Sequence, residues 1–325
     1  MTANGLTNVV KEQHRVAVEQ SSPSQTNKPV QGSGRFWAFG LVTVVLVLGF
    51  SRPLYDLMRF AAGSKLYSYT FLIPLITLYL IRLRRERLPR PSEPAYKFAA
   101  SALLAGSVGL VGYWLAVRSG SRLAPEDSLA LTTCSFLLFL LAAGFLFLGK
   151  ETLRPIAFPI AFLLFMSPLP LSLRDRIDTF LQHTSAATAD LLFRLSSTPV
   201  FRDDLAFQLP GFSLQVAPQC SGIHSSLVLF ITSLLAGSLF LRTPWKRAAL
   251  TLAVIPLAIL RNGFRIFIIG QLCVHIGPEM IHSPIHRHGG PLFFVLSLVP
   301  FLLLLVVLQK SDRAATTPKP EHHGV

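Results

Sequence analysis

The stretch Pro291–Leu308, PLFFVLSLVPFLLLLVVL, is almost wholly apolar and carries no charged residue. A helix of roughly 20 apolar residues crosses a hydrocarbon core about 30 Å thick, so this stretch predicts a transmembrane helix. The rest of the 325-residue chain has the same character, since 51% of its residues are hydrophobic and only 14% are charged. This composition is too apolar for an ordinary soluble domain. The protein is therefore expected to reside in a lipid bilayer.

Apolar stretches of similar length recur along the chain. They predict an all-α integral membrane protein, a polytopic bundle of about eight transmembrane helices. The polar residues 1–35 are too many and too polar for a cleaved signal peptide, and we expect a disordered cytoplasmic tail there. One transmembrane domain, residues 36–308, should follow, and residues 309–325 should form a second disordered cytoplasmic tail. The expected spans are 36–51, 66–81, 98–117, 128–148, 153–173, 220–241, 248–270 and 291–308.

The net charge of +14 is distributed in short Lys and Arg clusters between the apolar stretches. This distribution is typical of cytoplasmic loops and argues against a nucleic acid partner. The clusters at 82–90, 150–154 and 242–247, together with both termini, fall on the cytoplasmic side when about eight spans are assumed. The loops then expected outside are 52–65, 118–127, 174–219 and 271–290.

The longest outer segment, 174–219, has room for structure of its own. Its first half has apolar residues near helical spacing, which predicts a helix on the membrane surface. Its second half alternates short apolar and polar residues around Pro210 and Gly211. That pattern predicts a small strand-turn-strand element. Together the two halves should form a small extracytoplasmic cap.

A cysteine stands where the sixth span is expected to begin, in the stretch Ala217–Ser226, APQCSGIHSS. Unpaired N–H groups and the dipole at a helix N-terminus favour an anion, so the thiol of Cys220 tends toward its thiolate. One alternative is that Cys220 is a small apolar residue of a membrane helix, as expected for Cys134. Another is a structural disulfide with Cys273, which is also expected near the outer face.

The seventh span carries polar residues in its outer half, within the sequence LRNGFRI. Arg261 and Arg265 are four residues apart and share a helix face, and Asn262 lies beside them. Such groups need partners or a water-filled cavity inside a membrane. The alternative is that one or both arginines extend to the outer headgroups.

Histidines gather at the outer entry to the last span. His275, His282, His286 and His288 lie within CVHIGPEMIHSPIHRHGG. A metal site built from His282, His286 and His288 is an alternative, but the helical H-E-x-x-H of zinc proteases is absent. Cysteine and histidine together form a nucleophile–base pair, and arginine stabilises an oxyanion. Cys220, Arg265 and a histidine on one membrane side therefore predict acyl transfer.

At these residues the sequence resembles the exosortase/archaeosortase family of membrane-embedded cysteine transpeptidases, over roughly residues 40–308. The resemblance is carried by FPIAFLLFMSPLP (158–170), CSGIHS (220–225), RNGFRI (261–266) and HRHGG (286–290). These are similar to the family's Pro-rich end of the fifth span and to its C-S-G-x-[RH], N-x-x-R and H-x-x-x-G motifs. His224 stands where the family often has arginine.

The resemblance implies a catalytic set of Cys220 as nucleophile, Arg265 as essential arginine and His286 as acid–base histidine. Arg261, His282 and His288 are nearby alternatives, and Asn262 and His224 are expected to support the site. His224 lies one turn from Cys220, close enough to tune the thiol.

The implied substrates are exported proteins with a C-terminal sorting signal: a Pro-Glu-Pro-like motif, a transmembrane helix and a basic end. The acceptor would be an amine or water, without a cofactor. The implied location is the inner membrane of a bacterium, with the active site facing the periplasm. A polytopic transporter and a polysaccharide-export scaffold without proteolytic activity are the competing functions.

Overall fold

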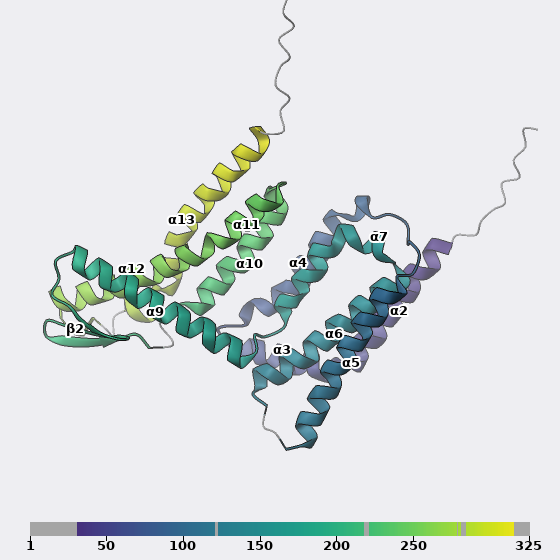
Figure 1. The fold of residues 1–325 in the computed structure, drawn as a ribbon, viewed down its shortest axis with the longest axis horizontal. Helices are drawn as coiled ribbons and strands as arrows, with labels where there is room; N and C mark the ends of the chain where they lie inside the picture. Colours follow the sequence, from purple (N-terminus) through teal and green to yellow (C-terminus); the bar gives the residue numbers. More distant parts are fainter. Residues whose placement is uncertain (1–30, 121–122, 218–220, 278, 281–283, 315–325) are drawn as a thin grey trace, which may run out of the picture.

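The computed structural model describes residues 31–120, 123–217, 221–277, 279–280 and 284–314. Most of this part of the chain is helical, and a small sheet lies at one end (Figure 1). Helix α2 begins at Gln31 and α13 runs to Ala314, so the helical part is longer at both ends than the predicted domain 36–308. The rest of the two predicted tails, 1–30 and 315–325, lies outside the described residues.

The first half of the chain forms one group of helices. Its α-helices are α2 (Gln31–Gly49), α3 (Ser51–Gly63), α4 (Leu72–Leu83), α5 (Tyr96–Arg118), α6 (Pro125–Phe147), α7 (Lys150–Leu153) and α8 (Ala157–Phe162). Its 3₁₀ segments are η1 (Ser68–Phe71), η2 (Arg85–Arg87), η3 (Arg154–Ile156) and η4 (Leu163–Met166).

Two glycines bring α5 and α6 into close contact. A Cβ atom on Gly109 would lie 2.7 Å from Oγ of Ser135, and one on Gly106 would lie 2.9 Å from the ring of Phe139. Small residues of this kind let helix backbones approach in a membrane, where apolar side chains gain nothing by leaving lipid. Helices α5 and α6 therefore form a closely packed pair in the first half of the chain.

The second half of the chain contains the cap and four further helices. Its elements are α9 (Leu171–Leu195), β1 (Phe201–Asp203), β2 (Ala206–Leu209), β3 (Phe212–Gln215), α10 (Ile223–Phe240), α11 (Pro244–Leu252), α12 (Val254–His275) and α13 (Pro284–Ala314).

Five helices in the described residues are long and apolar enough to cross a membrane, namely Tyr96–Arg118, Pro125–Phe147, Ile223–Phe240, Pro244–His275 and Gly290–Arg313. The number rises to seven when each of two bent pairs counts as one span, α2 with α3 at 67° and Lys150–Met166 with α9 at 89°. The expected span at 66–81 corresponds to a shorter apolar helix, Ser68–Leu83. The protein is thus an all-α polytopic membrane protein, as predicted.

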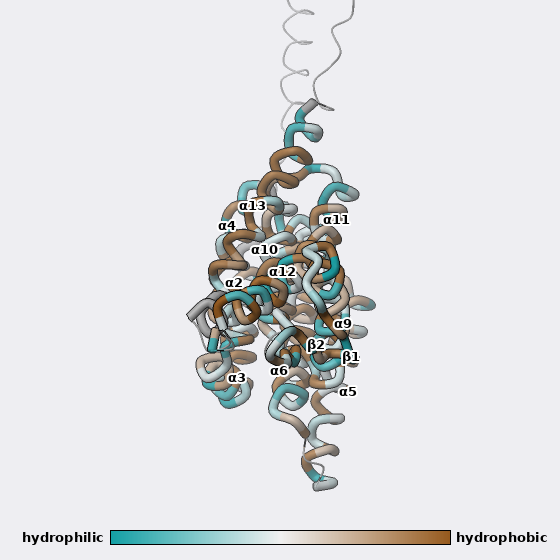
Figure 2. The backbone as a smooth tube through the Cα atoms, turned by 90° about the vertical axis from the view of Figure 1, so that its left-hand side faces the viewer, coloured by the Kyte–Doolittle hydropathy of each residue, from teal (hydrophilic) through white to brown (hydrophobic). Residues whose placement is uncertain are grey.

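Large apolar side chains remain exposed on the helices because lipid is their solvent. On α13, Leu303 is 62% and Val307 is 61% exposed, and hydrophobic residues run along this helix (Figure 2). Inside the protein, clusters of buried side chains join the helices: Phe162 and Leu57 belong to one in the first half, and Phe301 belongs to one in the second.

The cap consists of α9 and an antiparallel sheet in the order β1-β2-β3. The predicted strand-turn-strand element is confirmed as β2–β3, with β1 added beside β2. Helix α9 leaves an apolar row exposed, as expected for a helix at a membrane surface; the row is Leu173, Phe180, Leu191 and Leu195. We call the side of the protein that carries α3, α9 and the sheet the cap face (Figure 1).

Helix α9 crosses α12 at very close range. A Cβ on Gly263 would lie 2.6 Å from Thr188, and one on Gly270 would lie 2.4 Å from the ring of Phe193. The ring of Phe193 also packs on Phe207 of the sheet, with centroids 5.7 Å apart. The cap is therefore fixed on the helix that carries the predicted arginines.

The start of α9 is held from another direction by α6. The backbone N–H of Leu171 donates to Oδ1 of Asp127 across 2.8 Å, and Arg174 pairs with Glu126 at 2.6 Å. The cap consequently bridges the two halves of the chain at the cap face.

Candidate functional site

The entrance to α10 is the centre of the candidate site. Gly222, directly before the helix, has φ of +74°, a left-handed conformation that favours glycine. A Cβ there would also lie 3.1 Å from Nη2 of Arg261 and 3.1 Å from Oδ1 of Asn262. Backbone conformation and close approach therefore both require a glycine at this position.

Two side chains of α12 hold this entrance in place. Nη2 of Arg261 donates to the carbonyl oxygen of Gly222 across 3.2 Å and to Oγ of Ser226 across 3.1 Å. Nδ2 of Asn262 donates to the carbonyl oxygen of Ser221 across 3.0 Å. Arg261, Asn262 and Ser221 are buried, with exposed fractions of 8%, 2% and 1%. The two residues that follow Cys220 are thus bound to α12 inside the protein.

Arg261 does not extend to the headgroups, so that alternative is wrong for this residue. Its position is explained by the need of a buried cation for hydrogen-bond acceptors, which the entrance of α10 provides. Nη1 of Arg261 has no hydrogen-bond partner among the described residues. Arg265, one turn further along α12, is half-buried, and its charge acts on that of Arg261. The two guanidinium groups create a positive region beside the start of α10.

His224 lies in the first turn of α10 and points toward another segment. The side chain is exposed, and its Nδ1 lies 3.3 Å from the carbonyl oxygen of Leu66. Tyr67, which follows Leu66 in the chain, is buried, and this burial raises the pKa of its hydroxyl, which stays neutral. His224 therefore connects the entrance of α10 with the segment between α3 and η1.

A cavity of about 700 Å³ adjoins the same entrance. Leu66 and Ile223 form one side of it, and polar residues of α9 form the other: Arg174, Asp175, Asp178, Thr179 and Gln182. Nε2 of Gln182 donates to Oδ2 of Asp178 across 3.1 Å. This cavity offers room for a peptide segment directly beside the start of α10.

Several predicted site residues lie outside the described part of the chain. These are Cys220 and His282, and also the side chains of His286 and His288, whose backbone begins α13. The thiol–imidazole pair and the disulfide between Cys220 and the buried Cys273 therefore stay predictions. Cys134, by contrast, lies within α6 with Sγ 3.5 Å from Oγ of Ser167.

No group of three or more His, Cys, Asp and Glu residues within the described ranges is arranged to hold a metal ion. The predicted alternative ligand set of His282, His286 and His288 falls outside that test. Of the predicted site, the structure brings together Arg261, Asn262 and the segment after Cys220. Sequence reasoning missed Ser226, whose hydroxyl also donates to the carbonyl oxygen of Gly222 across 2.8 Å. The sequence feature that could have indicated this role is the pair Ser225–Ser226, about one turn into the expected span 220–241.

Comparison with known proteins identifies the family. No curated protein and no solved structure matches the chain. The family model described as transmembrane exosortase matches residues 61–303, well over half of the 325 residues. The match covers the cap, α10 with its entrance, α12 and the start of α13. The chain therefore belongs to the transmembrane exosortase family.

Proposed function

We propose that this protein is a membrane-embedded cysteine protease and transpeptidase that cleaves the C-terminal sorting signal of exported proteins. The observation that carries the proposal is the set of hydrogen bonds from Arg261 and Asn262 to Gly222 and Ser221. A nucleophile needs a rigid support to attack along a defined direction. The two residues after Cys220 have such a support, and it comes from the helix that also carries Arg265.

In the first half-reaction, Sγ of Cys220 attacks the carbonyl carbon of the scissile peptide bond. His286 takes the thiol proton as general base and returns it to the nitrogen of the leaving amine. The S–C bond forms and the C–N bond breaks, which leaves a thioester on Cys220. Arg265 stabilises the negative charge that develops on the carbonyl oxygen.

In the second half-reaction, an amine or water attacks the thioester carbon. His286 removes a proton from the attacking group, and the S–C bond breaks to restore the thiol. An amine acceptor gives transpeptidation, and water gives hydrolysis. Neither route requires a cofactor.

The substrate class in this proposal is an exported protein that ends in a Pro-Glu-Pro-like motif, one transmembrane helix and a basic segment. The basic clusters at the opposite ends of the helices support an orientation with the cap face outside, and on this proposal the protein acts at the periplasmic surface of a bacterial inner membrane. The motif of such a substrate would lie at the cap face, next to the cavity of about 700 Å³.

The test is a co-expression experiment with an exported reporter that ends in such a tail. We expect the wild type to shorten the reporter and Cys220→Ala to leave it intact. Cys134→Ala is the matched control, because Cys134 lies within α6 and has no part in the proposed mechanism, and it should process the reporter normally. Equal processing by Cys220→Ala and the wild type would overturn the proposal in favour of a scaffold or transporter.

A further inference from the structure

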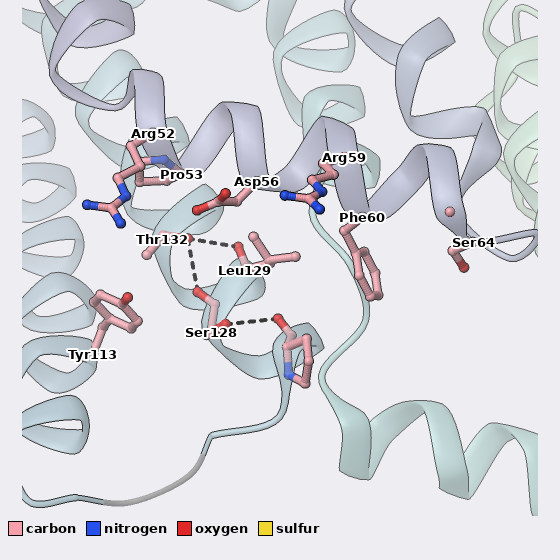
Figure 3. Close-up of a pocket in the computed structure, with 12 residues that line it drawn as sticks. Arg52, Pro53, Asp56, Arg59, Phe60, Ser64, Tyr113, Ser128, Leu129 and Thr132 are labelled. Atoms are coloured by element: carbon pink, nitrogen blue, oxygen red, sulfur yellow. Dashed lines mark hydrogen bonds between the residues drawn. The ribbon is translucent and has the colours of Figure 1, made fainter.

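A second cavity, of about 850 Å³, lies at the cap face between α3, α5 and α6 (Figure 3). Its polar lining consists of Arg52, Asp56 and Arg59 on α3, Ser64 directly after α3, Tyr113 on α5, and Ser128 and Thr132 on α6. None of these residues belongs to the candidate site or to the proposed mechanism. The cavity therefore calls for a separate explanation.

Helix α3 presents three charged side chains on one face. Arg52, Asp56 and Arg59 are spaced by four and three residues, so they share a side of the helix, while Leu57 and Ala61 of the other side are buried. Figure 3 shows the three charged groups in a row along the cavity. Seven residues of helix span roughly 10 Å, and two long arginine side chains can converge on one group across that distance.

These three charged side chains do not form ion pairs with one another. Among the residues that the structure describes, Asp56 makes no ion pair within 4.0 Å with Arg52 or Arg59, and none of the three forms a side-chain hydrogen bond. Exposed charges without partners inside one cavity are available to a ligand. Two guanidinium groups favour a phosphate, which arginine binds through paired hydrogen bonds.

The opposite wall of the cavity offers acceptors. Oγ of Ser128 donates to the carbonyl oxygen of Pro125 across 2.9 Å, and Oγ1 of Thr132 donates to that of Ser128 across 2.9 Å. The hydroxyl protons of Ser128 and Thr132 are thus donated to backbone carbonyls, and the lone pairs of their oxygens can accept a hydrogen bond from a ligand. With the carboxylate of Asp56, these oxygens favour a cationic group such as an ammonium. The cavity as a whole suits a ligand that carries both a phosphate and an amine.

The position of the cavity indicates that this ligand is a membrane lipid. Tyr113 lies five residues before the end of α5 at Arg118, which is roughly 7.5 Å along the helix. The 23-residue helix α5 is roughly 34 Å long, so when it spans a hydrocarbon core about 30 Å thick, Tyr113 lies close to the boundary of that core on the cap-face side. On the same turns of α5, Val111 and Trp114 are each 53% exposed, as expected for a wall that faces acyl chains.

We propose that this cavity binds the headgroup of a zwitterionic aminophospholipid from the leaflet at the cap face. The guanidinium groups of Arg52 and Arg59, whose side chains are longer than that of Asp56 between them, hold the phosphodiester away from the helix, and the ammonium group lies toward Asp56 and the hydroxyl oxygens of α6. The apolar side chains of Phe60 and Leu129 line the cavity beside the headgroup. The inference does not depend on the proposed protease activity.

The test is lipid binding to the purified full-length protein, followed by native mass spectrometry. The probes are phosphatidylethanolamine, phosphatidylglycerol and glycerophosphoethanolamine, which has the headgroup without acyl chains. We expect phosphatidylethanolamine to bind best. The double variant Arg52→Gln/Arg59→Gln should weaken its binding about tenfold or more, as expected for lost charge-assisted hydrogen bonds.

The matched control is Arg85→Gln/Arg176→Gln, which removes the same charge from two exposed arginines that do not line the cavity. It should change binding by less than about twofold, as expected for surface charges without a ligand. Equal binding by the two double variants would overturn the proposal. Glycerophosphoethanolamine that binds as tightly as the intact lipid would overturn the membrane source of the ligand.

Asp56→Asn gives an independent measurement if the double arginine variant fails to accumulate. Loss of this carboxylate should weaken the binding of phosphatidylethanolamine about threefold or more, because this lipid has an ammonium group to pair with Asp56. The binding of phosphatidylglycerol, which has no ammonium group, should stay unchanged or become tighter. An unchanged preference between the two lipids would contradict the assigned role of Asp56.

Discussion

The guanidinium group of Arg261, in α12, donates to the carbonyl oxygen of Gly222, directly before α10, across 3.2 Å, although the two residues are 39 positions apart in the sequence. The arginine is buried, and Gly222 stands directly before α10. A buried cation of α12 thus fixes the backbone at the point where the segment of the proposed nucleophile enters the helix. We regard Arg261 as a positioning residue, distinct from the proposed catalytic Arg265.

Replacement of this cation should disturb the proposed reaction more than the fold. Arg261→Gln cannot donate to Gly222 and Ser226 at once in the same geometry, and a buried hydrogen bond to a charged group is worth about 1.5–3 kcal/mol. We expect reporter processing to slow by about tenfold to a hundredfold at an unchanged amount of membrane-inserted protein. Time courses of processing at saturating reporter expression measure this rate.

The control for this variant is Arg176→Gln, which alters an exposed arginine of α9 at the same face. It should process the reporter at the wild-type rate. A wild-type rate for Arg261→Gln would show that the entrance of α10 does not need its contact with α12.

Alanine variants of two glycines with similar backbone conformations can distinguish the effect of backbone strain from a loss of function. Gly222 has φ of +74° and Gly211 has φ of +86°, and alanine in this conformation costs about 1–2 kcal/mol. Only at Gly222 would the new Cβ meet other side chains, since nothing lies within 4 Å at Gly211. Both alanine variants should melt at a lower temperature, but only Gly222→Ala should lose processing. Equal processing by the two variants would argue against a defined geometry at Gly222.

The crossing of α9 and α12 predicts a suppressor mutation. Gly270→Ala would place a Cβ 2.4 Å from the ring of Phe193, and overpacking of this kind costs about 1–3 kcal/mol. We expect a lower melting temperature in detergent and partial recovery in Gly270→Ala/Phe193→Leu, which removes the end of the ring. Gly112→Ala, with nothing within 4 Å of the new Cβ, should change stability little. Failure of the second substitution to restore any stability would contradict this contact.

The end of α13 is attached to the start of α11 through one carboxylate. Asp312 accepts from the backbone N–H of Arg242 across 2.6 Å, from the hydroxyl of Thr243, and from Nζ of Lys246 at 3.2 Å. Asp312→Asn leaves the buried Lys246 without its counter-charge, so we expect a clearly lower melting temperature.

Asp190→Asn serves as the control for this carboxylate. Asp190 pairs at 3.1 Å with Arg194, whose side chain is 68% exposed, and an ion pair within a helix whose cation is exposed to this extent contributes little. A loss of stability in Asp312→Asn no larger than in Asp190→Asn would count against the role of Asp312.

Much of the architecture could be predicted because membrane spans follow from local composition alone. The stretch that begins α10 and the polar residues at 261–265 could also be recognised as parts of a candidate site, since polar residues in an apolar span need an explanation. The breaks within spans were not predicted. The expected span 153–173 is divided into short α and 3₁₀ segments and then turns by 89° into α9. Pro155 and Pro159 remove backbone donors there, but the angle depends on packing against distant helices.

Contacts between distant segments could not be predicted from patterns in the sequence. The Leu66 carbonyl beside His224 and the cluster on α3 facing Tyr113 depend on how separate helices approach. Periodicity places a residue on a face of its own helix, and it carries no information about which helix faces it. The glycines at 263 and 270 decide the crossing of α9 and α12, and their role appears only when the partner side chains are known.

The measurement that tests the central claim most directly is capture of the thioester on Cys220. Membranes that contain the protein and the reporter are treated briefly with hydroxylamine, which cleaves thioesters, and the products are analysed by mass spectrometry. We expect a reporter hydroxamate ending at the scissile residue with the wild type and with Cys134→Ala, and none with Cys220→Ala. Formation of the same hydroxamate by Cys220→Ala, or tail cleavage by the wild type without any hydroxylamine-sensitive intermediate, would contradict the assignment of Cys220 as the nucleophile.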